Sequence, residues 1–186
     1  IYTGATPTRL TASAFAGYLA DNSALSNSCF EFAEDGAVLS HAGNLSFAGG
    51  TETRGNGLRF TGSRPTVSIS GDVSLDHAAI RFENGGDFSV GGDLTLAEAT
   101  YPAQSAEVYV IAAPTNETTA AYGATVAVGG TWTVGAKTFV RPVAEPHKGT
   151  VPGFAAGNFV LAAGGLVDAR ETGYSNGFGP SPGFHN

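Results

Sequence analysis

The most regular feature of the chain is a short unit in which glycine and then Asp, Asn or Thr precede an apolar residue, a Ser or Thr, and a second apolar residue. The unit occurs at residues 43–47, 71–75, 86–90, 92–96 and 130–134. Because successive side chains of a strand point to opposite faces, the two apolar residues share one face. Glycine followed by Asp or Asn favours a tight turn, through a positive φ and a hydrogen bond between side chain and backbone. Each unit therefore predicts a turn followed by a short strand.

Similar short strands are predicted between these units, at residues 58–60, 67–69, 80–82, 108–111, 126–128 and 159–161. Strands this short bury little apolar surface alone, so they must stack on one another. An antiparallel sandwich would need strands of about 5–6 residues joined by hairpins, with a turn about every 8–12 residues. A parallel β-helix instead holds two or three short strands in one coil and returns above itself after roughly 20 or more residues.

The spacing of the units favours the β-helix. The intervals that match one coil are 21 residues from Gly71 to Gly92, 21 from Val67 to Phe88 and 24 from Leu45 to Ile69. Two or three strands fit within each interval. We therefore predict an all-β protein that winds as a right-handed parallel β-helix, or β-solenoid, with long loops.

The first part of the chain differs from the rest, and residues 1–40 are predicted to form an N-terminal cap or a first coil. Residues 10–33 are rich in alanine and place apolar side chains at helix-like spacing, at Phe15, Tyr18, Leu19 and Leu25. Thr11 or Ser13 is a suitable N-cap. A short helix here would cover the first coil and its open edge. An irregular first coil is the alternative, and both remain open.

The stacked coils are predicted over residues 41–170, with two loop insertions. One lies near residues 112–122, which are rich in Thr, Ala and Asn around Pro114. The other lies near residues 142–153, where several prolines make a regular strand unfavourable. Residues 171–186 are predicted to form a C-terminal segment rich in Gly and Pro.

One C-terminal segment carries a resemblance. Residues 164–168 read Gly-Gly-Leu-Val-Asp, and residues 173–180 read Gly-Tyr-Ser-Asn-Gly-Phe-Gly-Pro. This resembles the Gly-Gly-x-Ile-Asp-Val-x-Gly strand and the Gly-Tyr-x-x-Gly-x-Gly-Pro loop of large secreted bacterial parallel β-helix proteins, similar to autotransporter passengers. The Gly-Gly-Asp-Leu-Thr-Leu sequence at 91–96 is similar to their strands too. The resemblance implies a β-helix from about Leu45 onward, a secreted or cell-surface location, and further Gly-rich sequence after Asn186.

Composition and charge narrow the range of partners. The formal net charge is −7, and the 9 Lys and Arg residues are too few and too scattered to neutralise a row of phosphates. Nucleic acid is therefore not an expected partner, and an anionic membrane surface is disfavoured. No apolar stretch reaches the ~18 residues that span a bilayer, so no membrane insertion is expected in this segment.

Cysteine usage does not identify the compartment. Cys29 is the single cysteine, so it cannot form an internal disulfide, and it is expected to be buried. The sequence begins at Ile1 and contains no Met, as expected of a processed product or a segment of a longer chain. The expected secreted or cell-surface location therefore comes from the resemblance alone.

Two carboxylates are predicted to stack. Asp72 and Asp93 occupy the same position of the repeated unit, so they would lie ~4.8 Å apart on successive coils. Like charges at that distance repel unless water or a cation lies between them, which makes a Ca²⁺ site one interpretation. An ordinary turn role after glycine is the favoured interpretation, and no other cofactor is expected.

A candidate carbohydrate site is the one cluster of acidic and basic residues that stands out, and it consists of Asp72, Asp76, Arg81, Glu83 and Asp93. His77 lies beside it in sequence. Glycoside hydrolases use two carboxyl groups, and lyases use a base with Ca²⁺ or Arg. The simpler interpretation is a solvated outer face. No nucleophile elbow, P-loop or dinucleotide fingerprint is present, so no catalytic residue is proposed and a non-enzyme is favoured.

The remaining aromatic and histidine residues are expected to be structural. The aromatic side chains predicted to stack inside the coils are Phe47, Phe60, Phe82, Phe88 and Trp132. Those in loop-like sequence are Tyr101, Tyr122, Tyr174, Phe178 and Phe184, for which packing on the wall is favoured over a sugar- or partner-binding platform. The histidines, which show no metal-ligand spacing and are expected in turns or on the surface, are His41, His77, His147 and His185.

Two functional hypotheses follow. The favoured one is an extracellular structural or adhesive module that self-associates through uncapped ends into a stalk or filament, or that binds a cell-surface partner. The alternative is a β-helix that binds or degrades polysaccharide, such as a lyase or a tail-spike-like protein, with a glycan as its partner.

Overall fold

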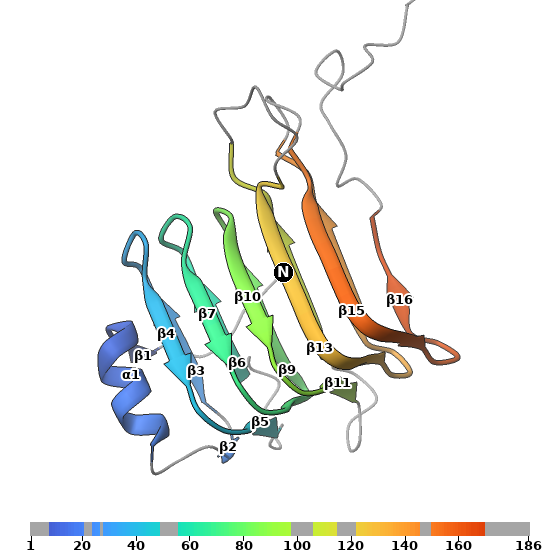
Figure 1. The fold of residues 1–186 in the computed structure, drawn as a ribbon, viewed down its shortest axis with the longest axis horizontal. Helices are drawn as coiled ribbons and strands as arrows, with labels where there is room; N and C mark the ends of the chain where they lie inside the picture. The colour runs from blue at the N-terminus through green and yellow to red at the C-terminus, as the bar shows by residue number, and fades with distance from the viewer. Residues whose placement is uncertain are drawn as a thin grey trace, which may run out of the picture.

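The computed structural model describes residues 8–20, 24–26, 28–48, 56–97, 106–114, 122–145 and 150–169. These residues form two parallel β-sheets and one short helix, so the all-β prediction is confirmed (Figure 1). Every strand pairing among them is parallel, which rules out the antiparallel sandwich for this part of the chain. The described residues form no helix with the length and apolar character needed to cross a membrane.

One sheet has seven strands and the other has nine. The seven-stranded sheet contains, in pairing order, β1 (Thr8–Arg9), β3 (Cys29–Phe32), β6 (Asn56–Phe60), β9 (Ala78–Phe82), β12 (Glu107–Ile111), β14 (Phe139–Val143) and β16 (Leu166–Val167). The nine-stranded sheet has a first leg of β4 (Val38–His41), β7 (Thr66–Ile69) and β10 (Gly86–Val90), and a second leg of β2 (Ala24–Ser26), β5 (Leu45–Ala48), β8 (Val73–Asp76) and β11 (Leu94–Ala97). The long strands β13 (Ala124–Val134) and β15 (Pro152–Leu161) run through both legs.

The chain visits these three surfaces in a fixed order. From β3 in the seven-stranded sheet it enters the first leg at β4 and the second leg at β5, and it then returns to the seven-stranded sheet at β6. The segments β6 to β8 and β9 to β11 repeat this order, and β12 to β13 and β14 to β15 follow it with one long strand in both legs. We call each round a pass. Figure 1 shows β4, β7, β10, β13 and β15 side by side in chain order, with α1 (Ala12–Leu19) at one end and β16 at the other.

Successive passes stack in register, and one predicted interval is wrong. Val67 pairs with Phe88, which confirms the interval of 21 residues for that pass. Leu45, however, pairs with Val73, which is 28 residues further along, and not with Ile69. The interval differs because the connection from β5 to β6 takes residues 49–55, whereas β8 and β9 are joined by a single residue.

Aromatic rings stack along the interior. The rings of Phe32, Phe60 and Phe82 follow one another on β3, β6 and β9, with centroids 4.8 and 4.9 Å apart. Such pairs contribute about 0.5–1.5 kcal/mol each beyond the burial of their area. The aromatic side chains predicted to be inside are all at most 1% exposed, namely Phe47, Phe60, Phe82, Phe88 and Trp132. That prediction is confirmed.

The N-terminal helix confirms one of the two alternatives for this region. In α1 the Thr11 side chain accepts a hydrogen bond from the backbone N–H of Ala14 at 3.2 Å, as an N-cap does. The helix buries Phe15 and Leu19, and the Phe15 ring lies 4.6 Å from that of Phe30. The helix therefore covers the apolar interior at one end of the stack.

The stacked passes extend into the N-terminal region that is predicted as a cap or a first coil. The strands β3 and β4 pair with β6 and β7, so the stacked arrangement already includes Cys29. Cys29 is buried, as predicted. The helix is shorter than the helix-like pattern of residues 10–33, because β2 and β3 lie within those residues. Tertiary pairing with the next pass outweighs the helix propensity of that alanine-rich segment.

The predicted proline-rich loop at residues 142–153 is shorter in the structure. Pro142 is part of β14 and pairs with Val110, and Pro152 is the first residue of β15. In a parallel strand alternate residues direct their backbone groups to opposite sides. The carbonyl of Val140 accepts from Asp168 on the β16 side, so the nitrogen of Pro142 also faces that side, where β16 has ended. The missing N–H of Pro142 therefore costs no hydrogen bond between strands.

The loop between β12 and β13 spans residues 112–123, close to the predicted insertion at 112–122. Residues 115–121 lie outside the described part of the chain, as does the predicted Gly/Pro-rich segment at 171–186.

Positive φ angles stack at the corner between the seven-stranded sheet and the first leg. Gly36, Arg64 and Gly85 have φ of 64°, 49° and 72° and occupy the same register position in three passes. The backbone N–H of Gly36 donates to Ser63 and that of Arg64 donates to Asn84, so the corner is held by bonds between passes. This corner requires a left-handed residue, and glycine adopts that conformation with least strain.

Three glycine-to-alanine substitutions separate backbone strain from close packing. At Gly57, φ is 122° and an added Cβ would overlap the carbonyl oxygen of Ala79, so Gly57→Ala is expected to destabilise the protein by about 3 kcal/mol or more. At Gly36 only the φ is unfavourable, so the loss is about 1 kcal/mol. Gly17 lies in α1 with no atom near its added Cβ, and Gly17→Ala should stabilise by about 0.5–1 kcal/mol. Urea denaturation of the three variants measures this order, and equal losses at Gly57 and Gly36 would contradict it.

Candidate interaction surfaces

A ladder of side-chain hydrogen bonds joins the passes at the corner between the two legs. The Oδ1 atom of Asn44 accepts from the backbone N–H of Asp72 at 2.8 Å, and Oδ1 of Asp72 accepts from the N–H of Asp93 at 2.9 Å. Oδ1 of Asp93 then accepts from the N–H of Thr131 at 2.7 Å. Each side chain thus satisfies the backbone of the following pass. The carboxylates of Asp72 and Asp93 stack as predicted, and a backbone N–H lies against each of them.

The ladder explains three of the five glycines of the repeated unit, and for these three the explanation differs from the predicted positive φ. Of the five glycines, only Gly86 has a positive φ, of 126°. A Cβ added to Gly71, Gly92 or Gly130 would instead overlap the Oδ1 atom of the residue that forms the ladder in the preceding pass. Glycine is required there by the close approach of that oxygen.

A second corner uses the same arrangement. Asp35, between β3 and β4, accepts hydrogen bonds from both the backbone N–H and the hydroxyl of Ser63 in the next pass, each at 2.8 Å. These two bonds lower the pKa of the Asp35 carboxyl below its usual value. Short acidic side chains therefore act as links between passes at two of the corners.

Charged side chains form ion pairs along the outer face of the seven-stranded sheet. Glu31 on β3 is 4% exposed and meets Arg9 at 2.8 Å and Arg59 at 3.3 Å. Arg59 also donates from Nε and Nη2 to the two carboxylate oxygens of Glu83, at 2.8 and 3.2 Å. The hydrogen bond to Glu83 is the main reason that the pKa of Arg59 is raised. Side chains from β1, β3, β6 and the residue after β9 thus form one connected group, which we call the first charge group.

A second charge group follows along the same face. Glu107 on β12 lies 3.0 Å from Nε of Arg141 and 3.9 Å from Nη1 of Arg81. The guanidinium carbon of Arg81 lies 4.4 Å from the ring centroid of Tyr109, and that of Arg141 lies 5.1 Å from the ring centroid of Phe139. In this arrangement the positive charge of the guanidinium is attracted to the negative face of the ring, a cation–π interaction.

The five residues of the predicted carbohydrate site are distributed over two surfaces. Asp72 and Asp93 lie at the corner of the nine-stranded sheet, whereas Arg81 and Glu83 lie on and just after β9 of the seven-stranded sheet. Asp76 ends β8, and its Oδ1 lies 2.7 Å from Nδ1 of the buried His77, which has a φ of 51°. His77 is predicted to lie in a turn or on the surface. It lies in a turn, and its side chain is buried there.

Several partners in the charge groups were missed by the sequence reasoning, namely Glu31, Arg59, Glu107, Tyr109 and Arg141. The signal that identifies them is the register, because Arg9, Glu31, Arg59, Arg81, Tyr109 and Arg141 pair in turn across the sheet. Their intervals are not constant, so the row is visible only once the strand bounds are known.

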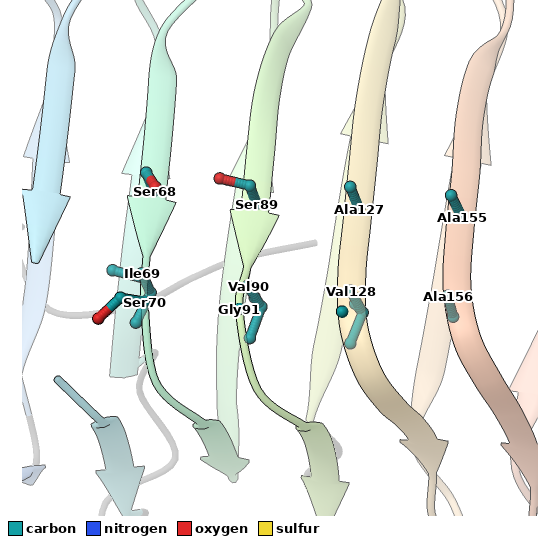
Figure 2. Close-up of a pocket in the computed structure, with 11 residues that line it drawn as sticks. Ser68, Ile69, Ser70, Ser89, Val90, Gly91, Ala127, Val128, Ala155 and Ala156 are labelled. Carbon is teal, nitrogen blue, oxygen red and sulfur yellow. The ribbon is translucent and has the colours of Figure 1, made fainter. Parts of the chain in front are cut away.

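A shallow groove of about 390 Å³ crosses the outer face of the first leg. Figure 2 shows its lining side chains on four adjacent strands, with Ser68, Ser89, Ala127 and Ala155 in one row. These four residues pair in register on β7, β10, β13 and β15. Because their side chains are small, the groove follows the row across the strands.

The last described pass exposes apolar side chains that its predecessor buries. Phe154, Phe159 and Leu161 on β15 are 40%, 46% and 50% exposed, although they pair with buried residues of β13. The ring of Trp132 on β13 lies 5.6 Å from each of the two phenylalanine rings. We call these three side chains, with the backbone edge of β15, the open end.

The aromatic residues of loop-like sequence are mostly outside the described residues, namely Tyr101, Tyr174, Phe178 and Phe184. Tyr122 is described; it is 61% exposed, and its ring lies where a Cβ on Gly153 would be placed. His147 and His185 are also outside the described residues, and Nε2 of His41 lies 3.0 Å from the carbonyl oxygen of Asn44.

Comparisons of the chain with protein-family models, with curated proteins and with solved structures found no match. Within the described residues, no three His, Cys, Asp or Glu side chains are grouped so that they could hold a metal ion.

The role of Asp72 can be tested by two substitutions. Asp72→Ala leaves the N–H of Asp93 without its acceptor and is expected to destabilise the protein by about 1 kcal/mol. Asp72→Asn keeps an Oδ1 acceptor, as Asn44 does naturally, and should change the stability by less than about 0.5 kcal/mol. Thermal unfolding with Ca²⁺ and with a chelator measures both variants. A Ca²⁺-dependent stabilisation that Asp72→Asn abolishes would contradict the backbone role and support the cation site.

The first charge group gives a second, asymmetric prediction. Arg59→Met leaves the buried Glu31 with only the exposed Arg9 and is expected to cost about 2–3 kcal/mol. Glu31→Gln leaves Arg59 paired with Glu83 and is expected to cost about 1 kcal/mol or less. The double variant should be more stable than the sum of the single losses predicts, because no charge is then left buried alone. Additive losses in denaturant unfolding would show that the pair does not act as a unit.

Proposed function

We propose that the chain is a right-handed parallel β-solenoid and that it serves as an extracellular structural or adhesive module, acting through self-association or through contact with a cell-surface partner. The observation that carries this proposal is that the charged side chains are bound to other parts of the chain. Asp72 and Asp93 bind the backbone of the next pass, and Glu31, Arg59 and Glu83 pair with one another. Charged groups engaged in this way favour a rigid scaffold over a reactive site.

The solenoid is supported by the order in which the chain visits its surfaces. Each pass supplies one strand or segment to the seven-stranded sheet, the first leg and the second leg in turn, always in parallel. Connections between parallel strands of one sheet are right-handed in about 98% of cases, which is the reason for the proposed hand. Three surfaces visited in turn would enclose the cluster of buried apolar side chains that the described residues form.

The extracellular location is supported by the resemblance of residues 164–180 to secreted bacterial β-helix proteins. The 9 Lys and Arg residues and the net charge of −7 disfavour nucleic acid as a partner. The adhesive or self-associating role is supported by the open end. Contiguous exposed apolar side chains are characteristic of interaction sites.

Polysaccharide binding is a second candidate, and one observation favours it. Tyr109 and Phe139 lie beside Arg81, Glu107 and Arg141 on one face, which combines apolar rings with hydrogen-bonding groups. Aromatic rings with charged groups beside them suit a ligand with one apolar face and one polar face. This site would differ from the predicted carbohydrate site, of which it retains only Arg81.

Electron microscopy of the purified chain at high concentration tests the self-associating module. We expect assembled particles whose fraction rises with protein concentration, because association through a defined surface obeys mass action. Binding to a glycan array, measured in parallel, tests the second candidate, with Tyr109→Ala as the variant and Tyr122→Ala, at an exposed ring away from the site, as the control. Strictly monomeric particles together with a glycan signal lost only in Tyr109→Ala would favour the second candidate over the first.

A further inference from the structure

The two ends of the stack are unlike each other. At the N-terminal end the edge strands β1, β2 and β4 have two, three and four residues, and α1 packs beside β4. At the C-terminal end the edge strand β15 has ten residues, and β13 is its one partner among the described strands. Short or covered edges resist pairing with another chain, whereas a long uncovered edge favours it.

The edge of β15 has little of the protection that edge strands usually carry, apart from the register shift at the corner opposite Val128 and Thr131 of β13. No residue of Pro152–Leu161 is charged. The one proline, Pro152, is the first residue of the strand, where it blocks little of the edge. The residues after it include Phe154, Phe159, Val160 and Leu161, all of them large, apolar and exposed.

The directions of the backbone groups of β15 follow from two hydrogen bonds to neighbouring residues. Before the corner, the carbonyl of Val151 accepts from the N–H of Gly123 at 3.1 Å, so Val151 faces β13. After the corner, the N–H of Ala162 donates to the carbonyl of Val134 at 2.9 Å, so Ala162 also faces β13. In a parallel ladder each residue directs both its backbone groups to one side, and the sides alternate along the strand.

Four residues of β15 therefore present their backbone N–H and C=O groups to the free edge. Steps of two from Val151 and from Ala162 give the residues that face β13, and the residues between them face the free edge. Outside the corner itself, those with both an N–H and a C=O group are Phe154 and Ala156 before the corner and Phe159 and Leu161 after it. Their side chains point to the interior, because they pair with Val126, Val128, Trp132 and Val134, which are all buried.

These four positions are symmetric about the middle of the strand. Reversal of the strand about the point between Gly157 and Asn158 exchanges Phe154 with Leu161 and Ala156 with Phe159. In an antiparallel pair, residues directly opposite each other share a face and, in the closely spaced pairs, exchange both backbone hydrogen bonds. Two reversed copies of β15 would meet these requirements at all four positions, with apolar side chains opposite apolar side chains.

We propose that β15 pairs in antiparallel fashion with β15 of a second copy of this chain, around a two-fold axis that passes between Gly157 and Asn158. Such an axis exchanges the two legs at their common corner, so both halves of the bent strand pair at once. The interface is isologous and closes as a dimer. This inference rests on the proposed self-associating function and specifies the surface, the symmetry and the size of the assembly.

The net charge of the chain and the helix that covers the N-terminal end both favour a dimer over continued end-to-end stacking of copies. Copies that each carry a net charge of −7 repel, so association is favoured where the surface is uncharged, as β15 is. Continued stacking would require the open end to meet the end covered by α1, where Phe15 and Leu19 are already buried. Pairing of two open ends leaves both α1 helices outside the interface.

Sedimentation equilibrium of the 186-residue chain over about 1 to 500 µM tests the proposal. The wild type is expected to fit a monomer–dimer equilibrium. Phe159→Lys places a charge in the interface and should weaken dimerisation by at least about 30-fold. Val38→Lys is the matched control, because Val38 is 65% exposed on β4 near α1, and its dissociation constant should stay within about twofold of wild type.

A second variant tests the backbone pairing without adding a charge. Ala156→Pro removes an N–H that faces the free edge and no N–H that faces β13, so it should weaken dimerisation while the circular dichroism spectrum stays that of the wild type. Asn158→Cys lies beside the proposed axis and should cross-link into a covalent dimer on mild oxidation, faster than the control Val38→Cys.

The outcomes separate this inference from the proposed function. A wild-type dimer that Phe159→Lys and Ala156→Pro dissociate and Val38→Lys does not would support the pairing of β15. If all the variants still self-associate, the pairing of β15 is overturned and the proposed function stays in place. The same conclusion follows if the wild type forms an open series of species larger than a dimer. A wild type that is monomeric over the whole concentration range would overturn both the pairing and the self-associating function. This holds also if the reason is that residues 170–186 occupy the edge of β15.

Discussion

The hydrogen-bonded register between successive passes is the constraint on which the rest of the structure depends. Because each pass lies directly on the previous one, residues of one kind recur at one place. The rings of Phe32, Phe60 and Phe82 form one stack, and the left-handed residues Gly36 and Arg64 form another. The same register brings an Asx oxygen against the next glycine at the corner of the two legs. One constraint thus accounts for the core, the turns and the composition of the repeated unit.

Much of this fold could be predicted from the sequence because the strands and their alternation are local properties. The inward aromatic side chains and the N-cap at Thr11 follow from residue type and spacing within a few positions. The interval between passes could not be predicted, because it depends on connections such as residues 49–55, whose length varies without changing the strands they join. For this reason Leu45 was assigned to Ile69 although it pairs with Val73. The role of the repeated glycines was missed for a related reason, since the oxygen that requires Gly92 belongs to the preceding pass.

The candidate site shows the same limit more strongly. Asp76, Arg81 and Glu83 are close in sequence, but the chain turns a corner after β8, so sequence neighbours face different surfaces. The partner of Glu83 is Arg59, which lies 24 residues earlier. In a stack of passes, side chains that interact lie next to one another along the direction of stacking rather than along the chain. Charged residues must therefore be compared at equal register and not at short sequence separation.

A stack held by register satisfies every pass except the first and the last. An interior strand has a neighbour on both sides for its backbone groups and its inward side chains, whereas an end strand has one. At the N-terminal end α1 supplies the missing apolar contacts through Phe15 and Leu19, and the edge strands are too short to leave many backbone groups exposed. At the other end the long strand β15 keeps the inward pattern of β13, so Phe154 and Leu161 retain core character without a core around them. The interaction that makes the interior regular therefore also leaves a surface at β15 that resembles the interior, and a strand of matching pattern would satisfy both its backbone groups and its apolar side chains.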